Sequence, residues 1–398
     1  MASYELRTTA CPHPIPSDHQ LVMDLLPQEI IDEIIDNLPR SSLRSSSLVA
    51  KRWRTRSQQR ALEKIWFINE SMVKTWHTDI QSNQNEITSR VQSARFKIAG
   101  QIDPVLFFCV LENFSSLTTL RVAHMDIPDE IPEHISRGEV GKRVTSLHLN
   151  CLLCPLSTVI STIMAFQNLE NLFLYDITTP SREPSSTYSA FPRRKPLDLL
   201  RVVGCVGQVA EILANVQIVS RRLILGVITQ NIQRLLSLSS ATVVELELKG
   251  VRSLCVDGKG TNENLTDYPY QSTSSPIVSA SSFPVLTSLT IYIDGRAPSS
   301  HLVNTLASIS SVSALVSIDL GCLYWPHSRS DMPYTWNGLD IRLAQMAKNT
   351  TVEGGLVLTL TRWRKRDQLV PEALLPRFGG VAKIVAKPPD QNVLAVER

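Results

Sequence analysis

LLPQEIIDEIIDNLPRSSLRSSSLVAKRWRTRSQQRALEKIW, residues 25–66, combines two Leu-Pro pairs with an amphipathic repeat. Pro27 suits the first position of a helix, because the N–H that it lacks is not needed there. The residue before a proline is pushed out of the helical region, so Leu38-Pro39 is expected to end this helix. Between the two prolines, aliphatic residues recur at helical spacing and acidic or amide residues fill the other side. The aliphatic residues are Ile30, Ile31, Ile34, Ile35 and Leu38.

Two further short helices are expected after the second proline. Ser41 or Ser42 can cap a helix that carries Leu43. Leu48, Val49 and Trp53 are predicted to lie on a third helix. Such a small three-helix unit leaves much apolar surface exposed, because the buried fraction of a domain falls with its size. The aliphatic stripe is therefore expected to be covered by a partner.

This order of residues resembles the F-box. The resemblance ends in the run Ser47-Leu48-Val49-Ala50-Lys51-Arg52-Trp53, in which Ala50 stands where the family usually has cysteine. In that family the F-box docks on a Skp-type adaptor, and the alternative interpretation is an ordinary three-helix cap on a larger domain. The resemblance implies that the adaptor is bound, directly or with internal support, by Leu26, Pro27, Ile30, Ile31, Ile34, Leu38, Leu43, Leu48, Val49 and Trp53.

Composition limits the class of protein. The chain has 398 residues, of which 43% are hydrophobic and 19% charged, a globular balance. The net charge of +3 argues against a dedicated nucleic-acid binder, whose affinity depends on neutralising phosphates. No signal peptide is expected from the first 20 residues, and the longest apolar run, 105–111, is too short to span a bilayer. We therefore expect a cytoplasmic or nuclear protein with no membrane partner, whose seven scattered cysteines are reduced.

A second pattern begins near residue 65 and continues almost to the end. A β-prone run at 65–68, a polar helix-like stretch at 71–91 and an apolar run at 94–99 suggest strand, helix and strand. A motif of three apolar residues in the spacing L-x-x-L-x-L then recurs, with most copies 23–29 residues apart. Its clearest copies centre on Leu120, Leu147, Leu172, Leu200, Leu246, Leu289 and Ile318, and weaker copies on Phe96, Leu223, Leu356 and Ile384. Amphipathic stretches between copies are expected at 156–166, 209–219, 232–238, 302–309 and 341–347.

This spacing resembles the degenerate leucine-rich repeats of fungal F-box proteins. Each motif is expected to form a strand that pairs in parallel with the next, while an α/β fold with chance apolar runs is the alternative. The predicted fold class is α+β, with a flexible tail over 1–20, an F-box over 21–63 and an irregular α/β solenoid over 64–398. Polar insertions interrupt the solenoid at 178–196, 257–282 and 324–338. The aromatic residues of the third insertion either form an interface or pack back on the solenoid.

No enzyme site or cofactor site is predicted. Cys151 and Cys154 have no second ligand pair nearby, so structural thiols are favoured over a metal or redox site. Residues 258–261 lack the leading glycine of a phosphate-binding loop, and no nucleophile, base and orienting group occur together. Two basic runs, 51–56 and 362–366, could serve nuclear import or an acidic partner, although solvated surfaces are the simpler interpretation.

The combined layout is similar to the substrate receptors of cullin-based ubiquitin ligases. The resemblance implies that the protein is not a catalyst and that it binds a Skp-type adaptor and, through it, a cullin. The repeats would capture an unidentified target protein and bring it close to a ubiquitin-loaded enzyme, which raises the effective concentration. The alternative is an F-box scaffold with a regulatory role that delivers no target for ubiquitination.

Overall fold

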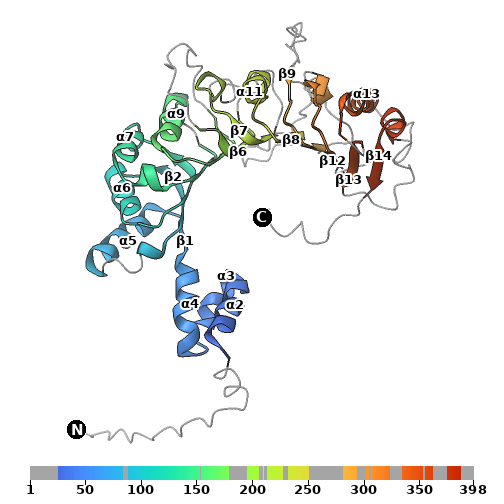
Figure 1. Ribbon diagram of the computed structural model, residues 1–398. Helices are drawn as coiled ribbons and strands as arrows, with labels where there is room; N and C mark the ends of the chain where they lie inside the picture. The colour runs from blue at the N-terminus through green and yellow to red at the C-terminus, as the bar shows by residue number, and fades with distance from the viewer. Residues whose placement is uncertain are drawn as a thin grey trace, which may run out of the picture. The chain divides into compact units, whose positions relative to one another are not determined.

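The computed structural model describes residues 26–83, 88–152, 154–178, 195–205, 209, 213–226, 232–250, 281–293, 302–303, 306–307, 309–322, 334–352, 355–361 and 374–386 (Figure 1). The chain divides into two compact units, Met1–Ile65 and Trp66–Arg398. The predicted tail over 1–20 lies outside the described residues, as do nearly all of the insertions at 178–196 and 257–282. The fold class is α+β, as predicted: N-terminal helices precede a parallel sheet with its own helices.

The first unit contains the helices α2 (Gln28–Asn37), α3 (Arg40–Ser46) and α4 (Lys51–Leu62). Leu38 adopts an extended conformation and ends α2, as the following proline predicts. Pro27 directly precedes the first helical residue rather than occupying it, and Pro39 does the same for α3. The prolines therefore mark both helix starts in this unit.

Two predictions about these helices are wrong. Ser41 and Ser42 lie inside α3 and do not cap it, because Pro39 already sets the extended backbone from which the helix begins. Leu48 and Val49 do not lie on the third helix. They form a hydrogen-bonded turn before it, in which the Leu48 and Val49 N–H groups donate to the carbonyl oxygens of Ser45 and Ser46.

The second unit is built on a twelve-stranded sheet in which nearly every neighbour in space is also the next strand in the sequence. Neighbouring strands from β2 to β14 are all parallel, for example with Leu120 opposite Leu147 and Leu147 opposite Leu172. The strands are β1 (Lys64–Phe67), β2 (Ser93–Gln101), β3 (Thr119–Asp126), β4 (Ser146–Asn150), β5 (Asn171–Tyr175), β6 (Leu197–Val203), β7 (Ser220–Gly226), β8 (Glu245–Gly250), β10 (Ser288–Ile293), β12 (Ser317–Cys322), β13 (Val357–Thr361) and β14 (Lys383–Ala386). Two short strands, β9 (Ser281–Ser282) and β11 (Ile309–Ser311), pair separately.

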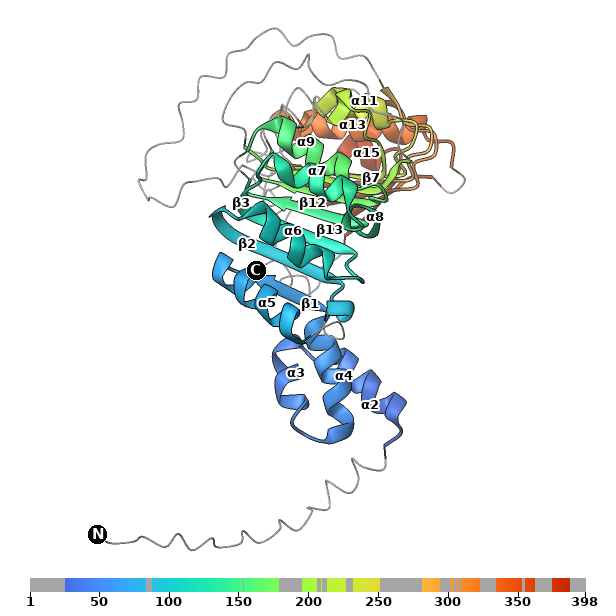
Figure 2. The same cartoon turned by 90° about the vertical axis from the view of Figure 1, so that its left-hand side faces the viewer.

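Helices alternate with these strands along the chain. They are α5 (Glu70–Asn83), a 3-10 helix (Thr88–Arg90), α6 (Pro104–Glu112), α7 (Glu130–Arg137), α8 (Val140–Arg143), α9 (Leu156–Ala165), α11 (Ile232–Ser239), α13 (Tyr334–Asn349) and α15 (Pro376–Gly379). Figures 1 and 2 show the longer helices along one side of the sheet, on the outer side of the arc that the strands follow: α5, α6, α7, α9, α11 and α13. The predicted helices at 156–166, 232–238 and 341–347 are confirmed.

The core lies between the sheet and this helical layer. The central residues of the seven clear copies and of the weaker copy at Leu223 are buried, and the registers place these eight residues in one row across the sheet. The weaker copies centred on Phe96 and Leu356 are off this row, because Leu120 lies opposite Ala94 and Ile318 lies opposite Leu358. At the first strands aromatic rings fill the layer: Phe96 stacks on Phe67 with ring centroids 4.7 Å apart and meets Phe107 edge-on at 4.7 Å. Burial of large apolar side chains is therefore the main stabilising term along the row.

The C-terminal end of the sheet is held by a buried carboxylate. Asp340 of α13 is 2% exposed and accepts hydrogen bonds from the backbone N–H groups of Arg377 and Phe378, which belong to α15. Trp336, one of the insertion aromatics, is fully buried on α13. The sequence left open whether the aromatic residues of this insertion form an interface or pack back on the solenoid. Trp336 packs inside the second unit, because the last part of the insertion is helical.

The other face of the sheet carries polar and aromatic side chains, among them His148. Its ring stacks on Phe173 at 3.9 Å between centroids with 5° between the planes, and its Nε2 lies 3.3 Å from the Ser146 hydroxyl. Burial lowers the pKa of His148 to about 3, and the positive charges of Arg121 and Arg201 contribute to the lowering. His148 is therefore neutral in the folded protein at physiological pH.

Replacing His148 by phenylalanine is expected to make the sheet less sensitive to acid. The folded pKa lies below the ordinary value of 6.5, so between the two values the unfolded chain binds a proton that the folded chain does not. The native protein thus loses stability as the pH falls through this window, and the variant lacks that contribution. Thermal unfolding at about pH 7 and about pH 5 measures the difference. Identical losses in both proteins would contradict the prediction.

Candidate protein interface

The aliphatic stripe of α2 divides into a buried row and an exposed row. Ile31 and Ile35 have no exposed surface, whereas Ile30 and Ile34 are 42% and 37% exposed. Adjacent residues on a helix point about 100° apart, so a stripe of paired aliphatic residues is too wide for one neighbouring helix to cover. The exposed row therefore contributes little to the stability of this unit.

The buried row belongs to a small internal core. Ile31 and Ile35 pack with Leu43 of α3 and Trp53 of α4, and partly buried residues surround them: Leu26, Leu38, Ala50 and Ala61. A buried hydrogen bond of 2.8 Å between the hydroxyls of Ser46 and Ser57 links α3 to α4 behind this core. Three helices thus bury one side of α2 and leave Ile30 and Ile34 partly exposed on the other side.

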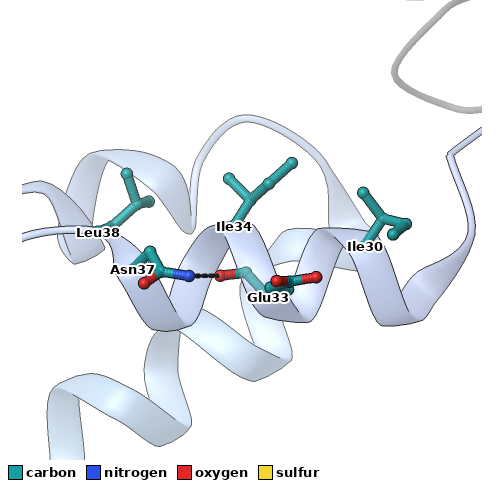
Figure 3. A pocket seen from close by; sticks show the side chains of 5 residues that line it. All are labelled: Ile30, Glu33, Ile34, Asn37 and Leu38. Atoms are coloured by element: carbon teal, nitrogen blue, oxygen red, sulfur yellow. Dashed lines mark hydrogen bonds between the residues drawn. The ribbon is translucent and has the colours of Figure 1, made fainter.

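The exposed row lines an open pocket on α2. Its walls are Ile30, Glu33, Ile34, Asn37 and Leu38. Figure 3 shows Ile30, Ile34 and Leu38 pointing to the same side of the helix, while the Asn37 side chain donates a 2.9 Å hydrogen bond to the Glu33 carbonyl oxygen. The pocket offers aliphatic contact with a polar border, which suits a protein partner.

The turn before α4 adds two more exposed aliphatic residues. Leu48 is 76% exposed and Val49 is 49% exposed. The turn itself is held by backbone hydrogen bonds and by the buried Ser46, so its shape does not depend on these two side chains. Large apolar residues presented on a rigid turn are typical anchors for a partner.

Ion pairs fix α2 against α4. The Arg56 guanidinium donates a 2.9 Å hydrogen bond to Asp36, and Arg60 lies 3.4 Å from the same carboxylate. The hydrogen bond from Arg56 lowers the pKa of Asp36 and raises that of Arg56 itself. One arginine of the basic run 51–56 is therefore used inside the unit, which leaves fewer charges of this run for nuclear import or an acidic partner.

The ten residues predicted to bind the adaptor thus fall into three groups. Pro27, Ile30, Ile34, Leu48 and Val49 are exposed, and Leu26 and Leu38 are half-buried. The remaining three, Ile31, Leu43 and Trp53, are buried in the internal core and can only support the surface from behind. Sequence reasoning missed Glu33 and Asn37, although their spacing of three residues from Ile30 and Ile34 places them at the border of the same side of the helix.

The chemical alternatives gain no support in the described part of the chain. No group of histidine, cysteine and carboxylate residues there is arranged to hold a metal ion. Cys154 is buried, and the Cys151 thiol lies 3.0 Å from the Asn150 side-chain oxygen. Cys151 follows β4 with φ of 49°, as Asp176 follows β5 with 48°, so both residues make the same left-handed exit from a strand. Residues 258–261 and 362–366 lie outside the described residues.

A sequence-family model described as F-box domain matches residues 23–63, which contain α2, α3 and α4. No curated protein sequence matches the chain significantly. Among the described residues, no helix combines the length and the apolar character needed to cross a membrane.

Proposed function

Because residues 23–63 carry an F-box domain, a type of domain that typically binds Skp1-type adaptors, we propose that this protein is a non-catalytic substrate receptor of a Skp-cullin-F-box ubiquitin ligase. In this proposal the first unit docks on the adaptor, and the adaptor connects it to a cullin. The second unit captures a target protein in the cytoplasm or the nucleus. The receptor contributes proximity rather than chemistry.

One observation carries the proposal: the exposed aliphatic surface of the F-box. Ile30 and Ile34 on α2 and Leu48 and Val49 in the turn are all large, apolar and at least one-third exposed. Covering such side chains with an apolar partner contributes about 25 cal/mol for each Å² of apolar surface removed from water. The same residues contribute little to the internal core, so their apolar character is best explained by a partner.

The proposed role of the second unit follows from its architecture. A sheet of consecutive parallel strands has an extended face not covered by its own helices, and repeat proteins use such faces to bind other proteins. We propose that residues 64–398 form an irregular leucine-rich-repeat solenoid that serves this purpose. A second candidate, a scaffold that binds the adaptor without delivering targets, shares the same F-box surface and differs only in the fate of the bound protein.

The proposal predicts that the turn Leu48-Val49 is needed for ligase assembly. The double variant Leu48→Asp/Val49→Asp should lose the adaptor and the cullin when the tagged chain is purified from cells, because two carboxylates would be buried without partners. Val105→Asp is the matched control, since Val105 is 60% exposed on α6, outside the F-box. Retention of adaptor and cullin by the double variant would refute the proposal. A ubiquitination assay on the proteins that remain bound separates the receptor from the scaffold.

A further inference from the structure

One row of side chains crosses the open face of the sheet from β2 to β6. The registers place Arg95 opposite Arg121, Arg121 opposite His148, His148 opposite Phe173, and Phe173 opposite Arg201. We call these five residues the arginine row. The residues that alternate with them along each strand point into the core, for example Leu147 and Leu172, which have no exposed surface. The arginine row therefore lies on the face that the helices of the unit do not cover.

The three arginines of the row form no ion pair with any described residue. Further along the same face the basic residues are neutralised. Arg222 lies 2.6 Å from Glu245 and Lys249 lies 3.1 Å from Glu247. Among the described residues of this face, the basic side chains on β7 and β8 are thus paired with carboxylates, whereas the three arginines between β2 and β6 are not.

The surroundings keep two of the three guanidinium groups in place. Arg95 lies over the ring of Trp66 at 5.5 Å from the centroid, and Arg201 lies over the ring of Tyr175 at 5.1 Å. The Nε atom of Arg201 is buried and has no hydrogen-bond partner among the described residues. An arginine whose rotamer is already fixed loses less entropy when it binds an anion.

The positive charges of the row lower the pKa values of groups within it. Burial lowers the pKa of Arg121, and the adjacent charge of Arg95 lowers it further. The charges of Arg121 and Arg201 likewise contribute to the low pKa of His148, so His148 and Phe173 form a neutral, flat platform between cationic groups. An anion placed beside Arg121 would relieve this repulsion.

We propose that the arginine row binds an extended acidic segment of a protein, with carboxylates paired to Arg121 and Arg201 and an apolar side chain on the platform of His148 and Phe173. This inference rests on the proposed function, because it names the chemistry of the captured target. Arg121 and Arg201 are three strand spacings apart, roughly 14 Å, which an extended peptide covers in about four residues. The bound segment therefore has two acidic residues about four positions apart with an apolar residue between them.

A nucleic acid also offers anions and flat rings, but the described face suits it less. Nucleic-acid binding depends on neutralising many consecutive phosphates, whereas the row holds three arginines and ends at the ion pairs of β7 and β8. The small net charge of +3 gives no general attraction to a polyanion. A short peptide with two carboxylates matches the spacing of Arg121 and Arg201.

The test uses random-sequence peptides displayed on phage and selected on the full chain in complex with its adaptor. We expect the selected peptides to be enriched in Asp and Glu at the spacing derived above. Affinity for a selected peptide should fall at least about tenfold in Arg121→Glu and in Arg201→Glu, because charge-assisted pairs become repulsive. Arg222→Gln is the matched control and should bind as the native chain does, since Arg222 is already paired on the same face.

Three outcomes would overturn the inference. The first is a selection without acidic enrichment, and the second is equal affinity of the Arg121→Glu and native chains. The third is a labelled single-stranded oligonucleotide that binds more tightly than the selected peptide and depends on Arg121. Retained adaptor binding and an unchanged melting temperature show that each variant is folded. A native chain that binds the adaptor but no acidic peptide overturns this inference alone, whereas a native chain that binds the acidic peptide without binding the adaptor overturns the proposed function alone.

Discussion

The Ile34→Asp variant is expected to fold like the native chain and to bind a Skp-type adaptor well over tenfold more weakly. Ile34 is 37% exposed and lies in the open pocket of α2, so the isolated F-box gains little from it. Burying an aliphatic side chain of this size contributes about 1.5–3 kcal/mol, and an unpaired carboxylate adds a desolvation cost. Since about 1.4 kcal/mol is tenfold in affinity, one substitution suffices. Isothermal titration of the purified chain with the adaptor measures the change.

The residue next to it supplies the contrast. Ile35 has no exposed surface and packs with Leu43 and Trp53, so Ile35→Ala should cost about 2–5 kcal/mol of folding free energy. Both variants are then expected to bind weakly for different reasons, and circular dichroism separates them by whether the F-box helices melt early. Native affinity of a folded Ile34→Asp variant would show that this surface is not the adaptor interface.

The second large effect is expected in the sheet. Leu246 of β8 is 1% exposed and lies between Leu223 of β7 and Leu289 of β10 in the central row. Leu246→Ala should cost about 2–5 kcal/mol through lost transfer energy and the cavity left behind. Against a total stability of roughly 5–15 kcal/mol, this loss can open several neighbouring strands. Limited proteolysis should therefore cut the variant within the sheet, and target capture should be lost.

Adaptor binding is expected to survive in the Leu246→Ala chain, because the two units are separately compact. Co-precipitation of the adaptor with the variant measures this. Val285→Ala, which truncates a residue that is 39% exposed just before β10, is the control and should leave both the proteolysis pattern and target capture unchanged. If adaptor binding disappears together with the sheet, the chain unfolds as one cooperative domain and the two-part organisation is wrong.

The strands were predictable because their signal is local and repeated. The leucines of each motif alternate with polar residues, and parallel neighbours place equivalent residues side by side. The spacing of the leucines in the sequence therefore identifies the residues that are buried in each strand. Several helices carried a weaker signal. The helix α6 is apolar on nearly all sides, and α7 contains Pro132, so neither shows a simple amphipathic pattern followed by a clear stop. The starts of α2 and α3 were misplaced because a proline can stand at the first helical position or just before it.

The aliphatic stripe of α2 was predictable from the sequence, but which of its residues are exposed to a partner was not. The sequence shows that Ile30, Ile31, Ile34 and Ile35 share a broad side of α2. Which edge of that side meets α3 and α4 depends on Leu43 and Trp53 and on the angle at which those helices cross α2. The same limit applies to the arginine row, whose successive members are 25–28 residues apart and become neighbours only through the register of the sheet.

The sequential order of the sheet has a consequence for how the protein is made. A chain leaves the ribosome N-terminus first, so each strand from β2 onward emerges after the strand on which it pairs. No strand of the large sheet has to wait for a distant segment that is still untranslated. The nascent sheet can therefore grow by one strand at a time, with a single new edge open to wrong partners at each step. The strands are thus synthesised in the order in which they pair in the sheet. We therefore expect this protein to depend less on chaperones during synthesis than a parallel sheet of this size with a different strand order.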